Sequence, residues 1–141
     1  MKSKCTPLMS QYLTAIDENR VGTYPAVCKS GAGYFFDDVL EYRVWCHPEE
    51  GAADVCNGED YYFSFSNYED ALEFSSHTEG AEAPLVLIRQ REWINEPLNG
   101  VFEHCKGERI AEWLPEWLER GPRKPGDIEQ FLKEAKKDCS E

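Results

Sequence analysis

The apolar run PLVLI at residues 84–88 constrains the fold more than any other stretch of this chain. As a strand it would be apolar on both faces, and such strands run through the centre of a sheet rather than along its edge. The run continues into RQREWI, so we expect one long central strand over residues 84–94. A central strand needs a neighbour on each side, and the other segments must supply them.

Two upstream segments alternate with the period of a strand. Residues 41–47 divide into two faces, one with Tyr42, Val44 and Cys46, the other with Arg43, Trp45 and His47. Residues 60–65 alternate in the same way and place Tyr62 and Ser64 on their polar side. Pro48 ends the first segment, because proline cannot donate to a strand ladder. We therefore expect two strands joined by an acidic loop.

Three helices are expected, and each has a recognisable start. Asn67 is suited to cap the first, with Asp70 three residues later. Pro115 falls inside a helical pattern, so we expect a short helix with this proline in its first turn. In the last helix Asp127 is the expected cap and Gln130 completes a capping box. One helix is therefore expected between the strands and two more after them.

The connections between the later strands are short. The turn NEPLNG leads to VFEHC, and the pair Lys106–Gly107 is a plausible tight turn into ERIAEW. The expected order is β-β-α-β-β-β-α-α, and a meander of this kind gives a mainly antiparallel sheet of about five strands with helices packed on it. The fold class is α+β. Residues 1–21 are expected to be an appendage with a modest helical stripe, and residues 22–141 a single domain.

The charge of the chain restricts its partners. It has 27 acidic and 15 basic residues, a net charge of −12. Such a surface repels nucleic acids and anionic membranes. No apolar run reaches the roughly 18 to 20 residues of a membrane span, and no apolar segment follows the early lysines as in a secretory signal. We expect a cytoplasmic protein that binds neither nucleic acid nor membrane.

The cysteines and histidines do not have the spacing of a metal site. Cys46–His47 and His104–Cys105 are adjacent pairs, whereas structural zinc sites separate paired ligands by about two to four residues. Adjacent side chains on a strand point to opposite faces. We expect no metal and free thiols at all six cysteines. The glycines of KSGAGY (residues 29–34) form a flexible loop rather than a phosphate-binding motif, so no cofactor and no catalytic residue is assigned.

One group of side chains remains as a candidate ligand face. Its members are Arg43, Trp45, His47, Tyr62, Arg89, Arg91 and Trp93. If their strands pair in one sheet, the arginines could bind an anion or a planar ligand. The alternative is an ordinary solvated sheet face whose arginines pair with local acids. Two tryptophans on such a face would require a cover, which could be a helix, a second subunit or a ligand.

Four stretches within residues 22 to 132 carry a resemblance, namely YPAVCKSGAGYFFDDVLEYRVWCHPEEGAADV, DYYFSFSNYEDALEFS, PLVLIRQREWI and ERIAEW. Through them the chain resembles a family of small acidic bacterial proteins of unknown function. Members are often labelled Gcn5-related acetyltransferase-like, and they are similar to the products of mobile (integron) gene cassettes. The R/Q-x-x-G-x-G/A loop with which such acetyltransferases bind acetyl-CoA does not occur in this sequence.

We therefore expect a small binding or interaction module that uses the Arg/Trp face. Its partner would be another protein or a small anionic or planar ligand, and the chain would form a homodimer. A small-molecule group transferase is the alternative, so whether the protein is an enzyme stays open. An acidic mimic of nucleic acid is a third interpretation, and it would require negative charge along one elongated surface.

Overall fold

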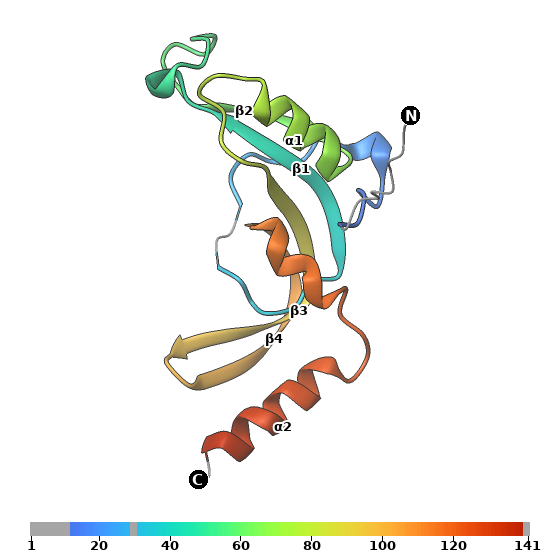
Figure 1. Ribbon diagram of the computed structural model, residues 1–141. Helices are drawn as coiled ribbons and strands as arrows, with labels where there is room; N and C mark the ends of the chain where they lie inside the picture. Colours follow the sequence, from blue (N-terminus) through green and yellow to red (C-terminus); the bar gives the residue numbers. More distant parts are fainter. Residues whose placement is uncertain (1–11, 29–30, 140–141) are drawn as a thin grey trace.

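The computed structural model describes residues 12–28 and 31–139, which build one antiparallel sheet with helices beside it (Figure 1). The four strands are β1 (Asp38–Cys46), β2 (Tyr61–Phe65), β3 (Leu85–Leu98) and β4 (Val101–Trp113), in the order β2-β1-β3-β4. The helices are α1 (Tyr68–Ser76) and α2 (Asp127–Cys139), with 3-10 turns η2 (Glu18–Arg20), η3 (Pro48–Glu50) and η4 (Pro115–Arg120). The α+β class is confirmed.

β3 has the central position that its apolar run predicts. It pairs with β1 on one side and with β4 on the other. Val86, Leu87 and Ile88 are fully buried, although their side chains alternate between the two faces. Both faces of the sheet are therefore covered at this point.

The expectation of about five strands is wrong for the described residues, because VFEHC and ERIAEW are parts of one strand. Gln90 lies opposite Arg109 and Glu92 opposite Lys106, so β4 contains one more residue than β3 over this interval. The extra residue makes a bulge, and Gly107 adopts a φ of +137° within it. The Lys106–Gly107 pair is therefore a bulge and not a turn, and the observed order is β-β-α-β-β followed by η4 and α2.

The start of α1 agrees with its sequence signal. The Asp70 amide donates to the Asn67 side chain at 2.8 Å, and the Asn67 amide group donates back to Asp70 at 3.1 Å. Pro115 begins η4, as expected. At α2 the capping box does not form. Asp127 is the first helical residue and accepts from the backbone of Lys124, while the Gln130 side chain donates to Glu134.

The buried apolar residues form three clusters. The main cluster joins the sheet to α1 and η4 and includes Phe36, Tyr42, Val86, Ile88, Ala111 and Trp113. A second contains Tyr24, Leu40 and Leu87. The third contains Phe35, Ile94 and Ile128 and joins α2 to the outer half of the β3–β4 hairpin, which extends beyond β1 (Figure 1). Two cores of this small domain therefore meet at the consecutive residues Phe35 and Phe36.

The described part of the N-terminal appendage is held against the sheet. Residues 12–17 are not helical, and the amides of Ala15 and Ile16 donate to the carbonyls of Ser66 and Val39, each at 2.8 Å. The part of the expected helical stripe that falls on residues 1–11 lies outside the described residues. Within the parts of the chain that the structure describes, no helix is long and apolar enough to cross a membrane.

Candidate functional site

Arg43, the first residue of the predicted face, lies in the interior of the protein. Its Nε atom donates to Glu41 at 2.7 Å and its Nη1 atom to Glu112 at 3.0 Å. Nη1 and Nη2 also donate to the carbonyls of Ala26 and Pro25, at 3.3 and 2.6 Å. Burial alone would lower the pKa of Arg43, but the hydrogen bonds with both carboxylates outweigh it and raise that pKa. All the guanidinium nitrogens bind the protein itself.

Trp45 and Tyr62 lie beside Arg43, as strand alternation predicts. They are directly opposite each other in the β1–β2 ladder, with ring centroids 4.8 Å apart. The Tyr62 ring lies 4.4 Å from the Arg43 guanidinium, and the Trp45 indole donates to Glu112 at 2.9 Å. The three residues therefore form one cluster, in which Arg43 and Trp45 donate to the same oxygen of Glu112 and Tyr62 donates to the carbonyl of Tyr24.

Arg89 and Arg91 meet at a single carboxylate. Arg89 Nη2 lies 2.8 Å and Arg91 Nη1 3.1 Å from the same oxygen of Asp38, and Arg89 also lies 3.7 Å from Glu108. These ion pairs agree with the alternative interpretation, a solvated sheet face whose arginines pair with local acids. An added anion would have to compete with Asp38 for both guanidinium groups.

His47 lies at the end of β1, between two acids. Its Nδ1 atom is 2.9 Å from Asp60, and its Nε2 atom contacts Glu82. Hydrogen bonds with Asp60 and Glu82 raise the pKa of His47. The ring therefore joins the end of the acidic loop to the segment before β3, and neither of its nitrogens is left for a ligand.

Trp93, the last predicted residue, contacts Arg109, which sequence reasoning did not select. The Arg109 guanidinium lies 4.6 Å from the centre of the Trp93 ring. Arg109 Nε donates to the side-chain oxygen of the fully buried Gln90. The Gln90 amide nitrogen in turn donates to the carbonyls of Ala32 and Phe35, at 2.9 and 2.8 Å. Arg109 is thus positioned on β4 just beyond the bulge, where bulges commonly redirect a side chain.

Arg109 differs from the other buried or half-buried arginines of the described residues, because it forms no ion pair with an acid. Among the described residues, the buried or half-buried arginines are Arg43, Arg89, Arg109 and Arg123, and all except Arg109 form ion pairs with carboxylates. Burial lowers the pKa of Arg109, with the thiol of Cys105 acting in the opposite direction. An arginine keeps its charge at neutral pH all the same. A partly buried cation without a counter-ion favours an anion from outside.

The backbone over Arg109 is shaped by glycine. Gly33 has a φ of +69°, and a Cβ atom there would lie 2.6 Å from Gln90 Nε2 and 2.7 Å from Arg109 Nη2. Only glycine leaves room for both groups, and it also adopts this φ without strain. The segment is fixed by the Ile94 amide, which donates to Gly33, and by the Trp113 indole, which donates to Gly31. We call residues 31–34 the glycine strap.

A cavity of about 330 Å³ opens between the glycine strap and the edge of β3. It is lined by the strap, by Ile94, Asn95 and Glu96, and by Arg109. Its volume is at the lower end of the range of small-molecule sites, about 300 to 1,000 Å³. The cavity therefore combines a cation with room for a small ligand.

Glu96 gives the same cavity a fixed negative charge. The Tyr34 hydroxyl donates to one oxygen of Glu96 at 2.7 Å, and the Gly100 amide donates to the other at 2.8 Å. The Gly100 amide and then the Tyr34 hydroxyl hold the pKa of Glu96 below its ordinary value. Tyr34 has a φ of +69°, which is rare outside glycine. Glu96 and Arg109 line one cavity, yet they form no ion pair with each other in the described structure.

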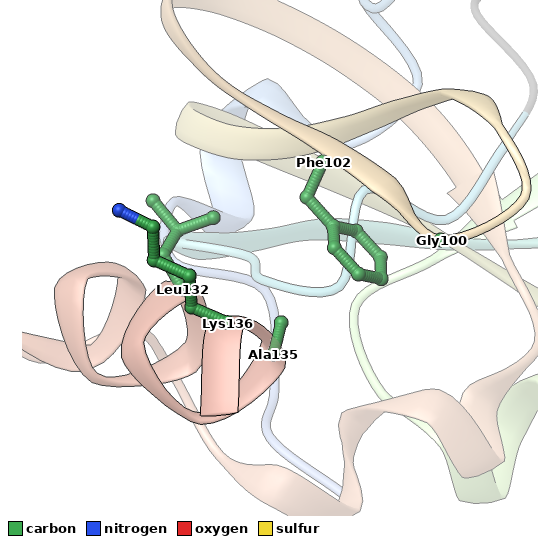
Figure 2. Close-up of a pocket in the computed structure, with 5 residues that line it drawn as sticks. All are labelled: Gly100, Phe102, Leu132, Ala135 and Lys136. Atoms are coloured by element: carbon green, nitrogen blue, oxygen red, sulfur yellow. The ribbon is translucent and has the colours of Figure 1, made fainter. Parts of the chain in front are cut away.

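A second hollow of about 320 Å³ lies between the tip of the β3–β4 hairpin and α2. Figure 2 shows Phe102 directed from the hairpin toward the helix, which presents Leu132 and Ala135, with Lys136 at the rim. The Phe102 ring also packs against Tyr34, with 6.1 Å between centroids. Tyr34 therefore connects the wall of this hollow to the Arg109 cavity.

Cys28, Cys46, Cys56 and Cys105, the cysteines whose side chains the structure describes, are free thiols. Within the described residues, no group of three or more His, Cys, Asp or Glu side chains could hold a metal ion. Comparisons with models of protein families, with curated proteins and with solved structures find no match to this chain.

Proposed function

We propose that this protein is a binding module for a small anionic ligand, which it holds at Arg109 beneath the glycine strap. One observation carries the proposal. Arg109 is a partly buried guanidinium that pairs with no carboxylate of the described residues, and it opens onto a cavity in a chain with 27 acidic residues. Where so many acids are present, an unpaired arginine at this depth is best explained by an external anion.

The orientation of Arg109 suits a planar anion. The Trp93 ring covers one face of the guanidinium, and Gln90 occupies Nε. The two Nη atoms remain for a ligand, and a pair of N–H groups on one guanidinium matches the two oxygens of a carboxylate. A lysine would keep the charge but lose this geometry and the stacking on Trp93.

The setting restricts the ligand to a small molecule. The cavity holds about 330 Å³. The net charge of −12 gives the protein a long-range field that repels polyanions. The proposed site therefore shares Trp93 with the ligand face predicted from the sequence, but its ligand binds to Arg109, which that face did not include. Formation of a homodimer stays a prediction, and sedimentation velocity of the purified chain tests it.

The test is calorimetric titration of the protein with acetate, benzoate and inorganic phosphate at low ionic strength. The key variant is Arg109→Gln, and the matched control is Arg91→Gln, which removes an exposed arginine already paired with Asp38. We expect at least one carboxylate to bind the wild type and the control, with a loss of affinity of about tenfold or more in Arg109→Gln. Equal binding by Arg109→Gln, or no binding of any of the three anions to the wild type, overturns the proposal.

A further inference from the structure

We infer that the ligand of the Arg109 cavity is a zwitterion, a small amino acid whose carboxylate binds Arg109 and whose ammonium binds Glu96. This inference rests on the proposed function, and it adds the chemical class of the ligand. The observation behind it is that one cavity contains an unpaired guanidinium and a fixed carboxylate that do not pair with each other in the described structure.

Glu96 has the properties of an ammonium acceptor. Its two oxygens are held by the Tyr34 hydroxyl and the Gly100 amide, which leaves further acceptor capacity on each oxygen. These hydrogen bonds favour the ionised form, in agreement with its lowered pKa. A charged acceptor with a fixed position forms stronger hydrogen bonds to a cation than a neutral acceptor does.

The geometry of Tyr34 also points to a ligand. A non-glycine residue at a φ of +69° is strained, and such strain is commonly kept at functional sites. The ring is held by Phe131 of α2, with centroids 4.9 Å apart. In this conformation the hydroxyl reaches Glu96 while the backbone remains part of the strap over the cavity. The strained residue thus connects the carboxylate to the wall of the site.

Long-range electrostatics favour a zwitterion over a simple anion. The chain carries a net charge of −12, so a monoanion approaches the protein against a repulsive field. An amino acid has no net charge and is not repelled, yet it presents one charge to each group of the site. The two complementary charges of the site then favour a ligand that can direct its carboxylate to Arg109 and its ammonium to Glu96 at the same time.

The rest of the lining limits the side chain of such an amino acid. Ala32 and Ile94 are the aliphatic residues of the lining, and the volume of about 330 Å³ is small. Neutral amino acids with short aliphatic side chains fit this description. L-Alanine, L-valine and L-leucine are therefore the probes of choice, because they share both charged groups and differ only in apolar volume.

The test compares each amino acid with its N-acetyl derivative, which keeps the carboxylate but lacks the ammonium. Calorimetric titrations use the full chain as wild type, Glu96→Gln, Tyr34→Phe and Arg109→Gln. Glu129→Gln removes an exposed acid on α2 and serves as the control. Glu96→Gln keeps the shape of the side chain, and Tyr34→Phe keeps the ring while removing the hydroxyl. Circular dichroism establishes that each variant is folded.

We expect at least one free amino acid to bind the wild type at least tenfold more tightly than its N-acetyl derivative. Glu96→Gln should abolish that difference by weakening only the free amino acid, Tyr34→Phe should reduce it, and Arg109→Gln should weaken both compounds. The wild type could instead bind both compounds equally, with binding unaffected by Glu96→Gln but lost in Arg109→Gln. That result overturns the inference of a zwitterionic ligand but supports an anion site at Arg109. Binding of neither compound also overturns this inference, and the acetate, benzoate and phosphate titrations then decide the proposed function separately.

Discussion

The Nε atom of Arg43 lies 2.7 Å from a carboxylate oxygen of Glu41, and both side chains are completely buried. The same carboxylate accepts from the Gly22 amide at 2.7 Å and the Ser64 hydroxyl at 3.2 Å. Within the described residues, no buried side-chain nitrogen or oxygen lacks a hydrogen-bond partner. This ion pair therefore joins the loop before β1 to the sheet, and the loop covers the face that sequence patterns offered to a ligand.

Replacing Arg43 by methionine should lower the free energy of unfolding by about 3–5 kcal/mol, because Glu41 would remain buried without a counter-ion. Urea denaturation followed by circular dichroism measures the change. The control is Arg91→Met, which removes an exposed arginine and should cost no more than about 1 kcal/mol. A loss in Arg43→Met no greater than in the control would contradict the structural role of the pair.

Replacing Gly33 by alanine should destabilise the protein and weaken anion binding. The new methyl group would collide with Gln90 and Arg109, and the backbone would be strained at about 1–2 kcal/mol. Thermal unfolding and carboxylate titration measure the two effects. Gly31→Ala is the control, because Gly31 also has a positive φ of +105° but open space around its Cβ position. An equal loss of affinity in both variants would show that Gly33 has no special relation to Arg109.

The contact of His47 with Asp60 and Glu82 predicts a dependence of stability on pH. The pKa of His47 is raised in the folded protein. Its stabilising contribution is therefore complete below the unfolded pKa of about 6.5, and it is lost as the pH rises through the higher folded value. Urea denaturation of the wild type and His47→Gln, from about pH 6 to about pH 9, should show a gap that narrows with rising pH. A gap of constant size would contradict this ion pair.

Phe131→Ala should loosen α2 and the strap together. The ring contacts Tyr34, Phe35 and Phe102, with centroid distances of 4.9, 5.8 and 5.2 Å. Its removal should cost roughly 1–3 kcal/mol, because the ring is only partly buried. Affinity for carboxylates should fall as well, since Tyr34 then loses its support. Normal affinity in this variant would show that α2 does not position the strap.

Local patterns in the sequence were sufficient to predict several parts of the fold. Alternation placed Arg43, Trp45 and Tyr62 together, and β1 and β2 pair as that requires. The Asn67 cap and the start of η4 at Pro115 depend on a few neighbouring residues, and both were predicted correctly. Contacts within a short segment can be derived from side-chain chemistry, because few competing arrangements exist.

The site could not be predicted in the same way, because it depends on register. Arg109 lies opposite Gln90 rather than an acid only because β4 has its particular pairing with β3, including the bulge at Gly107. Glu41 lies only two residues from Arg43, but other acids that neutralise arginines are distant in sequence, as Glu112 is from Arg43 and Asp38 from Arg89. The spacing of residues along one strand contains no information about such partners. The glycines of KSGAGY were the one visible signal, and without the partner strand they indicated only a loop.

Phe35 and Phe36 are neighbours in the chain, but they belong to different apolar clusters. We expect the Phe35 cluster to open on its own, since α2 lies beside the outer part of the β3–β4 hairpin and away from β1 and β2 (Figure 1). Amide hydrogen exchange would then show α2 and residues 94–104 exchanging as one cooperative unit, ahead of β1 and the inner half of β3. A bound ligand would couple these two units, because the strap connects them. Ligand binding would then slow the exchange of backbone amides in α2, although no residue of this helix lines the Arg109 cavity.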